Sequence, residues 1–211
     1  MKFEMKSVVI PIILLNIAFF IIEMVFQGRF IEPLILRSID VVIARPWILL
    51  TSMFLHAGTN HLIFNMYTLF IFGPVLEQRI GPRRFLLLYL FSGVFAGFLS
   101  SFFYNSALGA SAAIMGVIGA LIILMPGLKL LLFFVVPMPL WVAGILYALL
   151  DIFGVLFPSG VGNIAHLAGM GIGLLYGLAL KKEKRKFDRN FSSKSHLGQE
   201  DIEEYLKSGR I

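Results

Sequence analysis

Four polar side chains lie in otherwise apolar stretches of the chain, and together they could carry out acyl transfer. They are Ser111, His166, His61 and Asn65. A serine hydroxyl becomes a nucleophile when a base removes its proton, and histidine is the base that proteins use most often. His61 and Asn65 are four residues apart, so a helix would place them on one face, where both could donate hydrogen bonds to an oxyanion. These residue types therefore predict a serine–histidine pair beside an oxyanion site.

Each of these residues also has a structural interpretation. Ser111 lies in the segment GASAAIMG, and a serine among small residues often serves helix packing. His166 could be a hydrogen-bonded core histidine, and His61 could face lipid headgroups. Asn65 could bond two helices together. The catalytic interpretation is favoured because three separate helices would bring these residues to one level.

The composition indicates a membrane protein. Hydrophobic residues make up 58% of the 211 residues and charged residues only 14%, which is too apolar for an ordinary water-exposed surface. The chain has no cysteine, so disulfides and cysteine-based metal sites are excluded. The net charge of +6 is concentrated near the C-terminus. We therefore interpret the charge as a topology signal and expect no nucleic-acid partner.

We predict six transmembrane helices, each near the roughly 20 residues that cross the hydrocarbon, except for a shorter fourth. Their ranges are 8–26, 60–78, 85–104, 111–125, 130–150 and 163–180. The first range follows a basic start but is not followed by a small-residue cleavage site, so we expect a retained helix and no signal peptide. The predicted fold is an all-α, polytopic six-helix membrane domain over residues 1–182. A polar, basic cytoplasmic tail over residues 183–211 is expected to follow it.

The connection between the first and second predicted helices is too long and too apolar for a plain loop. Its stretches 30–36 and 47–55 are apolar but too short to cross a bilayer. We predict short interfacial or partly embedded helices there, forming a membrane-embedded first loop with Trp47 as an interface aromatic. Pro137 and Pro139 fall inside the fifth predicted helix and are expected to bend it.

Basic residues indicate the orientation of this bundle. One side carries most of them, namely Lys2, Lys6, Arg79, Arg83, Arg84, Lys129 and the cluster over 181–189. The other side carries three arginines, all in the first connection. The positive-inside rule therefore predicts that both termini are cytoplasmic. The second, fourth and sixth helices then run inward, and all four candidate site residues lie near the outer ends of these helices, at a similar depth.

Stripes of small residues begin beside two of the candidates. The fourth predicted helix has Ala112, Gly116 and Ala120 at a spacing of four residues. The sixth has the corresponding stripe Ala165, Gly169, Gly173 and Gly177. Such stripes allow two membrane helices to approach closely. We predict that these two helices pack together and so hold Ser111 near His166.

Four segments of the sequence resemble the rhomboid family of intramembrane serine proteases. They are PWILLTSMFLHAGTNHLIFNM (46–66), FGPVLEQRIGPRRFLLLYLFSG (72–93), GASAAIMG (109–116) and AHLAGMGIG (165–173). The resemblance implies a six-helix core that uses neither a cofactor nor a metal, with two catalytic residues instead of a triad. By resemblance, Ser111 is the nucleophile and His166 the general base. His61, Asn65 and the backbone N–H of Ser111 would serve the oxyanion site.

Two positions depart from the family's usual pattern. Ala112 replaces the glycine that usually follows the nucleophile, and Met115 replaces an aromatic residue that often packs on the catalytic histidine. A thioether can still pack against an imidazole. Asp151 is the carboxylate nearest to the sixth predicted helix in sequence. We expect it to be a solvated helix end, with tuning of His166 as the alternative.

The resulting functional hypothesis is peptide-bond hydrolysis in or near the transmembrane segments of single- or multi-span membrane proteins. The site would open to the outer aqueous side, and substrates would enter from the bilayer past a bent fifth helix. The alternative is a non-catalytic rhomboid-like protein that binds transmembrane segments. A transporter is less favoured, because the inner halves of the predicted helices lack polar residues. The compact form suggests a prokaryotic plasma membrane.

Overall fold

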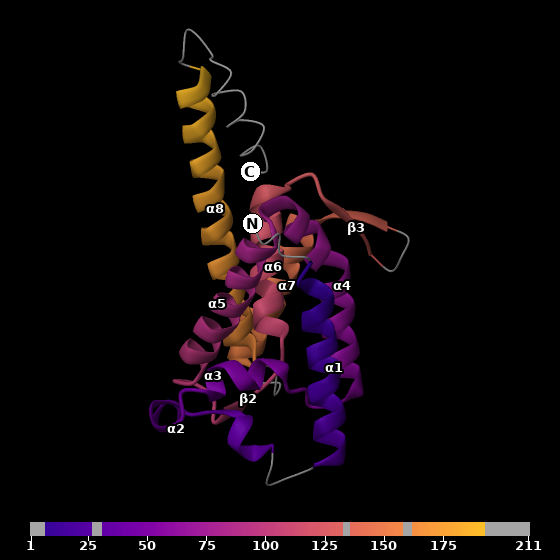
Figure 1. The fold of residues 1–211 in the computed structure, drawn as a ribbon, viewed down its shortest axis with the longest axis vertical. Coiled ribbons are helices and arrows are strands. Elements are labelled where there is room, and N and C mark those ends of the chain that lie inside the picture. The colour runs from indigo at the N-terminus through magenta and orange to yellow at the C-terminus, as the bar shows by residue number, and fades with distance from the viewer. Residues whose placement is uncertain (1–6, 27–30, 133–135, 158–161, 193–211) are drawn as a thin grey trace, which may run out of the picture.

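The protein is described by a computed structural model that covers residues 7–26, 31–132, 136–157 and 162–192. Its described part is mainly helical (Figure 1). The longer helices are α1 (Val9–Val25), α4 (Thr59–Ile80), α5 (Pro82–Ser100), α6 (Ser111–Leu124), α7 (Leu140–Leu156) and α8 (Asn163–Ser192). These helices pack side by side as a bundle (Figure 1).

Two helical segments are long and apolar enough to cross a membrane by themselves. They are Pro82–Ser100 and Asn163–Glu183, whereas α1, α6 and α7 are apolar but shorter. Large apolar side chains on the outer helices are exposed, including Leu14 on α1, Phe91 on α5 and Leu150 on α7. Apolar residues that face outward are typical of helices surrounded by lipid.

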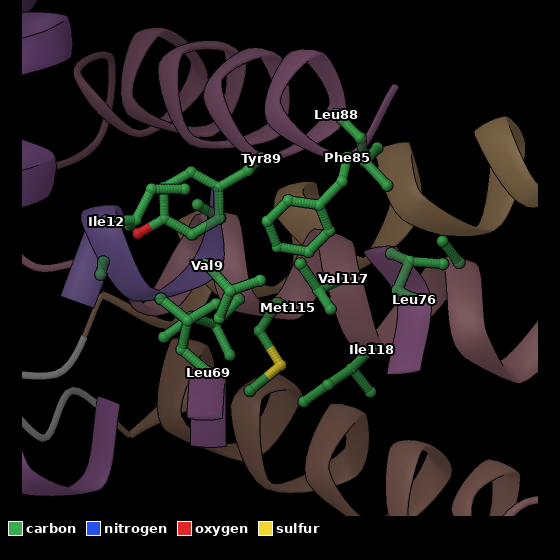
Figure 2. Packing of buried hydrophobic residues seen from close by; sticks show 14 of the residues in the cluster. Val9, Ile12, Leu69, Leu76, Phe85, Leu88, Tyr89, Met115, Val117 and Ile118 are labelled. Carbon is green, nitrogen blue, oxygen red and sulfur yellow. The ribbon is translucent and has the colours of Figure 1, made fainter. Parts of the chain in front are cut away.

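Helix α6 forms the centre of the bundle. Every residue from Ala112 to Leu121 is buried, and the most extensive contacts of α6 are with α8. The surrounding core is built from several helices and includes Val9 of α1, Leu69 of α4 and Tyr89 of α5 (Figure 2). Met115 lies in this core among aliphatic side chains (Figure 2). Because α6 is buried over most of its length, the position of Ser111 in its first turn is fixed by the surrounding helices.

The contact between α6 and α8 confirms the predicted packing of the small-residue stripes. A Cβ atom added at Gly169 would lie 2.0 Å from the Ala112 carbonyl oxygen, and one at Gly173 would lie 2.0 Å from that of Gly116. Either distance is a severe overlap. The two helices therefore meet backbone against backbone, which only glycine permits at these positions.

The predicted start of the fifth helix is wrong. Two antiparallel strands, β3 (Lys129–Leu132) and β4 (Val136–Pro139), lie where the first part of this helix was predicted. Pro137 and Pro139 lie in β4, so they do not bend a helix. The reason is local: proline has no N–H and disfavours helical conformation in the residue before it, so α7 starts only after Pro139.

Helix α8 also continues beyond the predicted stop at Lys181 and Lys182. It runs on to Ser192 and projects past the rest of the bundle (Figure 1). Lysine, arginine and glutamate are good helix formers, so charge ends the apolar segment without ending the helix. Near this end, Glu183 lies 3.5 Å from Arg84 of α5 and forms an ion pair with it. Most of the predicted tail lies outside the described residues.

Short elements make up the described part of the connection after α1. They are η1 (Glu32–Leu34), β1 (Leu36–Arg37), α2 (Ile39–Ala44), α3 (Ile48–Thr51) and η2 (Ser52–Phe54). Leu36, Val42 and Ile48 form a small apolar cluster of their own. Strand β1 pairs with β2 (Ser106–Ala107), just before α6. The connection is thereby tied to the chain that leads into Ser111.

Candidate active site

Ser111 and His166 are brought together by the close contact of α6 and α8. Ser111 is the first residue of α6, and His166 lies in the first turn of α8. The Ser111 Oγ is 2.8 Å from the His166 Nε2, a hydrogen-bonding distance. His166 is buried and Ser111 is half-buried. This is the geometry of a hydroxyl next to a base that can accept its proton.

Asp151 contacts the other nitrogen of the same ring. Its Oδ1 lies 3.0 Å from the His166 Nδ1, and its side chain is buried. The expectation that Asp151 is a solvated helix end is therefore wrong. Helix α7 continues past it to Leu156, so Asp151 lies within the helix and faces α8. The alternative interpretation, in which Asp151 acts on His166, fits the geometry.

An aromatic ring also lies beside His166, although it comes from an unexpected helix. The ring centroids of Tyr147 and His166 are 5.9 Å apart. Tyr147 lies one turn before Asp151 on α7, so one helix presents both side chains to the imidazole. Sequence reasoning missed Tyr147. Its spacing of four from Asp151, in a helix that is otherwise apolar, was the available signal.

His61 and Asn65 converge on the backbone that enters α6. A Cβ atom at Gly109 would lie 2.7 Å from the His61 Cε1 and 3.8 Å from the Asn65 Nδ2. Gly109 has a φ of +121°, and its N–H donates to the Ser52 carbonyl oxygen at 2.9 Å. Glycine is needed here both for its backbone conformation and for this close approach. The structure thus brings all four predicted site residues to one end of the bundle.

The Asn65 side-chain amide can donate a further hydrogen bond. It is buried, and its Nδ2 has no hydrogen-bond partner among the described residues. A buried donor without a partner is costly, and such donors are rare unless a ligand completes them. The first N–H groups of α6 also have no partners within the helix, because no helical carbonyl precedes them. These donors suit an oxyanion beside Ser111.

A further histidine, His56, lies next to His61. It was not among the site residues predicted from the sequence. It is buried, and its ring centroid is 5.1 Å from that of His61. Its backbone N–H donates to the Glu23 carboxylate of α1 at 3.0 Å. Burial, helped by the neighbouring His61, lowers the pKa of His56 to about 4, so its ring is neutral at neutral pH.

Comparison with known proteins identifies the family of the chain. The family model for the rhomboid domain matches residues 44–183, a stretch that contains all four predicted site residues. The chain belongs to the rhomboid family. The resemblance seen in its motifs is therefore confirmed. Rhomboid proteins are integral to membranes, so this chain is a membrane protein.

The rhomboid relatives come from several kinds of organism. The chain is 34% identical over 158 residues to RHOMBOID-like protein 6, mitochondrial, of Arabidopsis thaliana, covering 72% of this chain and 49% of that protein. It is 33% identical over 197 residues to Rhomboid protein 1, mitochondrial, of Saccharomyces cerevisiae, covering 88% of this chain and 56% of that protein. It is 44% identical over 78 residues to Rhomboid protease GluP of Bacillus subtilis, covering 36% of this chain and 15% of that protein.

The lengths and names of these relatives bear on the expected catalytic activity and on the expected membrane. The chain spans about half the length of the first two relatives. Some relatives are named as proteases and others only as rhomboid-like. Because mitochondrial as well as bacterial proteins are among them, the expectation of a prokaryotic plasma membrane gains no support.

Proposed function

We propose that this rhomboid protein is an intramembrane serine endopeptidase. It hydrolyses peptide bonds in or near the transmembrane segments of membrane-protein substrates. The observation that carries the proposal is the 2.8 Å separation of the Ser111 Oγ and the His166 Nε2 at the start of a buried helix. At this distance the hydroxyl can pass its proton to the ring.

The reaction follows from this arrangement. His166 accepts the Ser111 proton as the Oγ attacks the peptide carbonyl, and the oxyanion is held by the Ser111 backbone N–H, His61 and the Asn65 amide. His166 then gives the proton to the leaving amine nitrogen, and an acyl-enzyme remains. Water hydrolyses the ester, again with His166 as base. The start of α6 adds the positive end of a helix dipole beside the developing negative charge.

We further infer that all six longer helices cross the bilayer and that both termini are cytoplasmic. Arg79, Arg83 and Arg84 lie at the turn between α4 and α5, and the α8 residues Lys181 and Lys182 lie at the same end of the bundle as that turn. This basic end would face the cytoplasm. The site and the first connection would then lie toward the outer side, where water can reach Ser111.

Substrates of one or several spans would enter from the bilayer past α7. The bend that was expected to open this route is absent, because Pro137 and Pro139 lie outside α7. Support for the route comes instead from the exposed apolar side of α7, which includes Leu146 and Leu150. A substrate helix must unwind locally before its carbonyl can be attacked, so helix-weakening residues near the cut site are favoured.

The proposal is tested by labelling with a fluorophosphonate probe and by cleavage of a model single-span substrate in liposomes. Wild type should be labelled and should cleave, whereas Ser111→Ala and His166→Ala should lose labelling and keep at most a small residual rate of cleavage. The alternative, a non-catalytic protein that binds transmembrane segments, predicts no labelling and no cleavage by wild type. Cleavage by both variants at the wild-type rate would also disprove the protease proposal.

A further inference from the structure

Asp151 is a buried carboxylate inside an apolar helix. Burying a carboxylate is costly unless hydrogen bonds or an opposite charge compensate it. The Oδ1 of Asp151 lies 3.0 Å from the His166 Nδ1, while its Oδ2 has no partner among the described residues. The imidazole is therefore the group that compensates this carboxylate.

The contact selects one form of the histidine ring. A neutral imidazole carries one N–H and one lone pair. An ionised carboxylate only accepts hydrogen bonds, so the ring proton is held on the Nδ1 that faces Asp151. The lone pair is then on the Nε2, which lies 2.8 Å from the Ser111 Oγ. This is the tautomer that a general base needs.

The same carboxylate suits the next state of the reaction. When the Ser111 proton moves to the Nε2, the ring becomes an imidazolium with a proton on each nitrogen. The ionised Asp151 stabilises that positive charge without taking up a proton, and the proton on the Nε2 goes on to the leaving amine nitrogen.

Tyr147 supports this arrangement from the same face of α7. Its ring lies one turn before Asp151 and 5.9 Å, centroid to centroid, from the imidazole. Carboxylate and aromatic ring thus confine His166 from one helix, whereas Ser111 approaches it from another. Helix α7 thereby supplies the orientation that a two-residue arrangement would have to obtain from packing alone.

We propose that Asp151 is a positioning residue for His166, which makes the site a Ser–His–Asp triad. The two catalytic residues that the family resemblance implied are then joined by a third group. This inference rests on the protease function proposed above. The competing interpretation is structural, with the Asp151–His166 contact serving only to fasten α7 to α8.

The first test is Asp151→Asn in the full chain, with the model single-span substrate in liposomes. The side chain keeps its size but loses its charge, so the Nδ1 tautomer is no longer imposed. We expect kcat to fall about 10²- to 10⁴-fold with KM changed by less than about twofold, and fluorophosphonate labelling to slow in parallel.

A second measurement separates positioning from fastening. In a His166→Ala background, Asp151→Asn should change the residual rate by less than about twofold, because residues that act as one unit are not additive. A merely structural Asp151 would lower the rate by a similar factor in both backgrounds.

Glu77 provides a matched control. It is another buried carboxylate, and it accepts hydrogen bonds from the Ser7 hydroxyl at 2.5 Å and the Val8 N–H at 2.6 Å. Glu77→Gln should lower the thermal unfolding midpoint while kcat per folded molecule stays within about twofold of wild type.

The outcomes distinguish this inference from the proposed function. If Asp151→Asn keeps the wild-type kcat, or slows the His166→Ala background as much as it slows wild type, the positioning role is disproved. If Ser111→Ala and His166→Ala both cleave normally, the protease function itself fails.

Discussion

At the scale of single residues, the site contains polar groups that folding leaves incomplete. The Asn65 Nδ2 and both ring nitrogens of His56 are buried without hydrogen-bond partners among the described residues. Asn65 adjoins the backbone before Ser111, and His56 adjoins His61. Each buried group of this kind lowers the stability of the fold by about 1–3 kcal/mol. A functional role is one reason for a protein to keep such groups.

Asn65→Ala is therefore expected to reduce activity without reducing stability. Loss of one oxyanion donor lowers kcat about 10²- to 10³-fold, while the folded protein loses no internal hydrogen bond. Steady-state kinetics and thermal unfolding in detergent measure both effects. Asn16→Ala is the control, because the buried Asn16 donates to the Ile12 carbonyl oxygen at 2.8 Å on α1. That control should lose stability and keep kcat; a normal kcat in Asn65→Ala would contradict the oxyanion role.

His56 is expected to make the fold sensitive to acid. Its pKa is lowered from 6.5 to about 4 in the folded protein, so the unfolded chain binds the proton more readily. This contribution to stability is complete above about pH 6.5 and is lost as the pH falls toward about 4. Thermal unfolding at about pH 7 and about pH 5 should show a smaller difference for His56→Gln than for wild type. Equal differences would contradict the assignment.

At the scale of helices, the separation of Ser111 and His166 depends on the glycines of α8. Gly169→Ala would place a methyl group 2.0 Å from the Ala112 carbonyl oxygen, so the helices must move apart. Such overpacking costs about 1–3 kcal/mol or more and should lower kcat as well. Gly171→Ala is a matched control on the same helix, since nothing lies within 4 Å of the added Cβ. Unfolding midpoints and kcat should separate the two variants, and equal behaviour would contradict the packing role.

Apolar length and small-residue stripes predicted the approximate positions of most of the longer helices and the pairing of α6 with α8. They predicted where Ser111, His166, His61 and Asn65 would gather, because apolar length and depth follow from the sequence. The strands β3 and β4 before α7 were missed, because short apolar stretches have the same appearance in a strand and in a helix. That error moved the predicted end of the fifth helix to Asp151. As a consequence, Asp151 was expected to be exposed to solvent at a helix end, although it is buried beside His166.

At the scale of the whole molecule, the two ends of the bundle differ in charge. Arg83 is exposed at the turn between α4 and α5, and Ser106 is exposed on the strand before α6. The chain has no cysteine, so single cysteines can be introduced without removing any. In sealed, oriented vesicles, a membrane-impermeant maleimide should label Ser106→Cys from the outside and Arg83→Cys only after lysis. Labelling of both from one side would contradict the proposed topology.

The backbone contact between α6 and α8 has a mechanical consequence. Hydrogen atoms are the only side-chain atoms of Gly169 and Gly173 at this contact, so no rotamer change can adjust the spacing of the two helices. Helix α7 presents large apolar side chains outward, and its contact with α8 is less extensive than the contact of α6 with α8. Changes in bilayer thickness or tension should therefore alter the alignment of Asp151 with His166 before they alter the distance from His166 to Ser111.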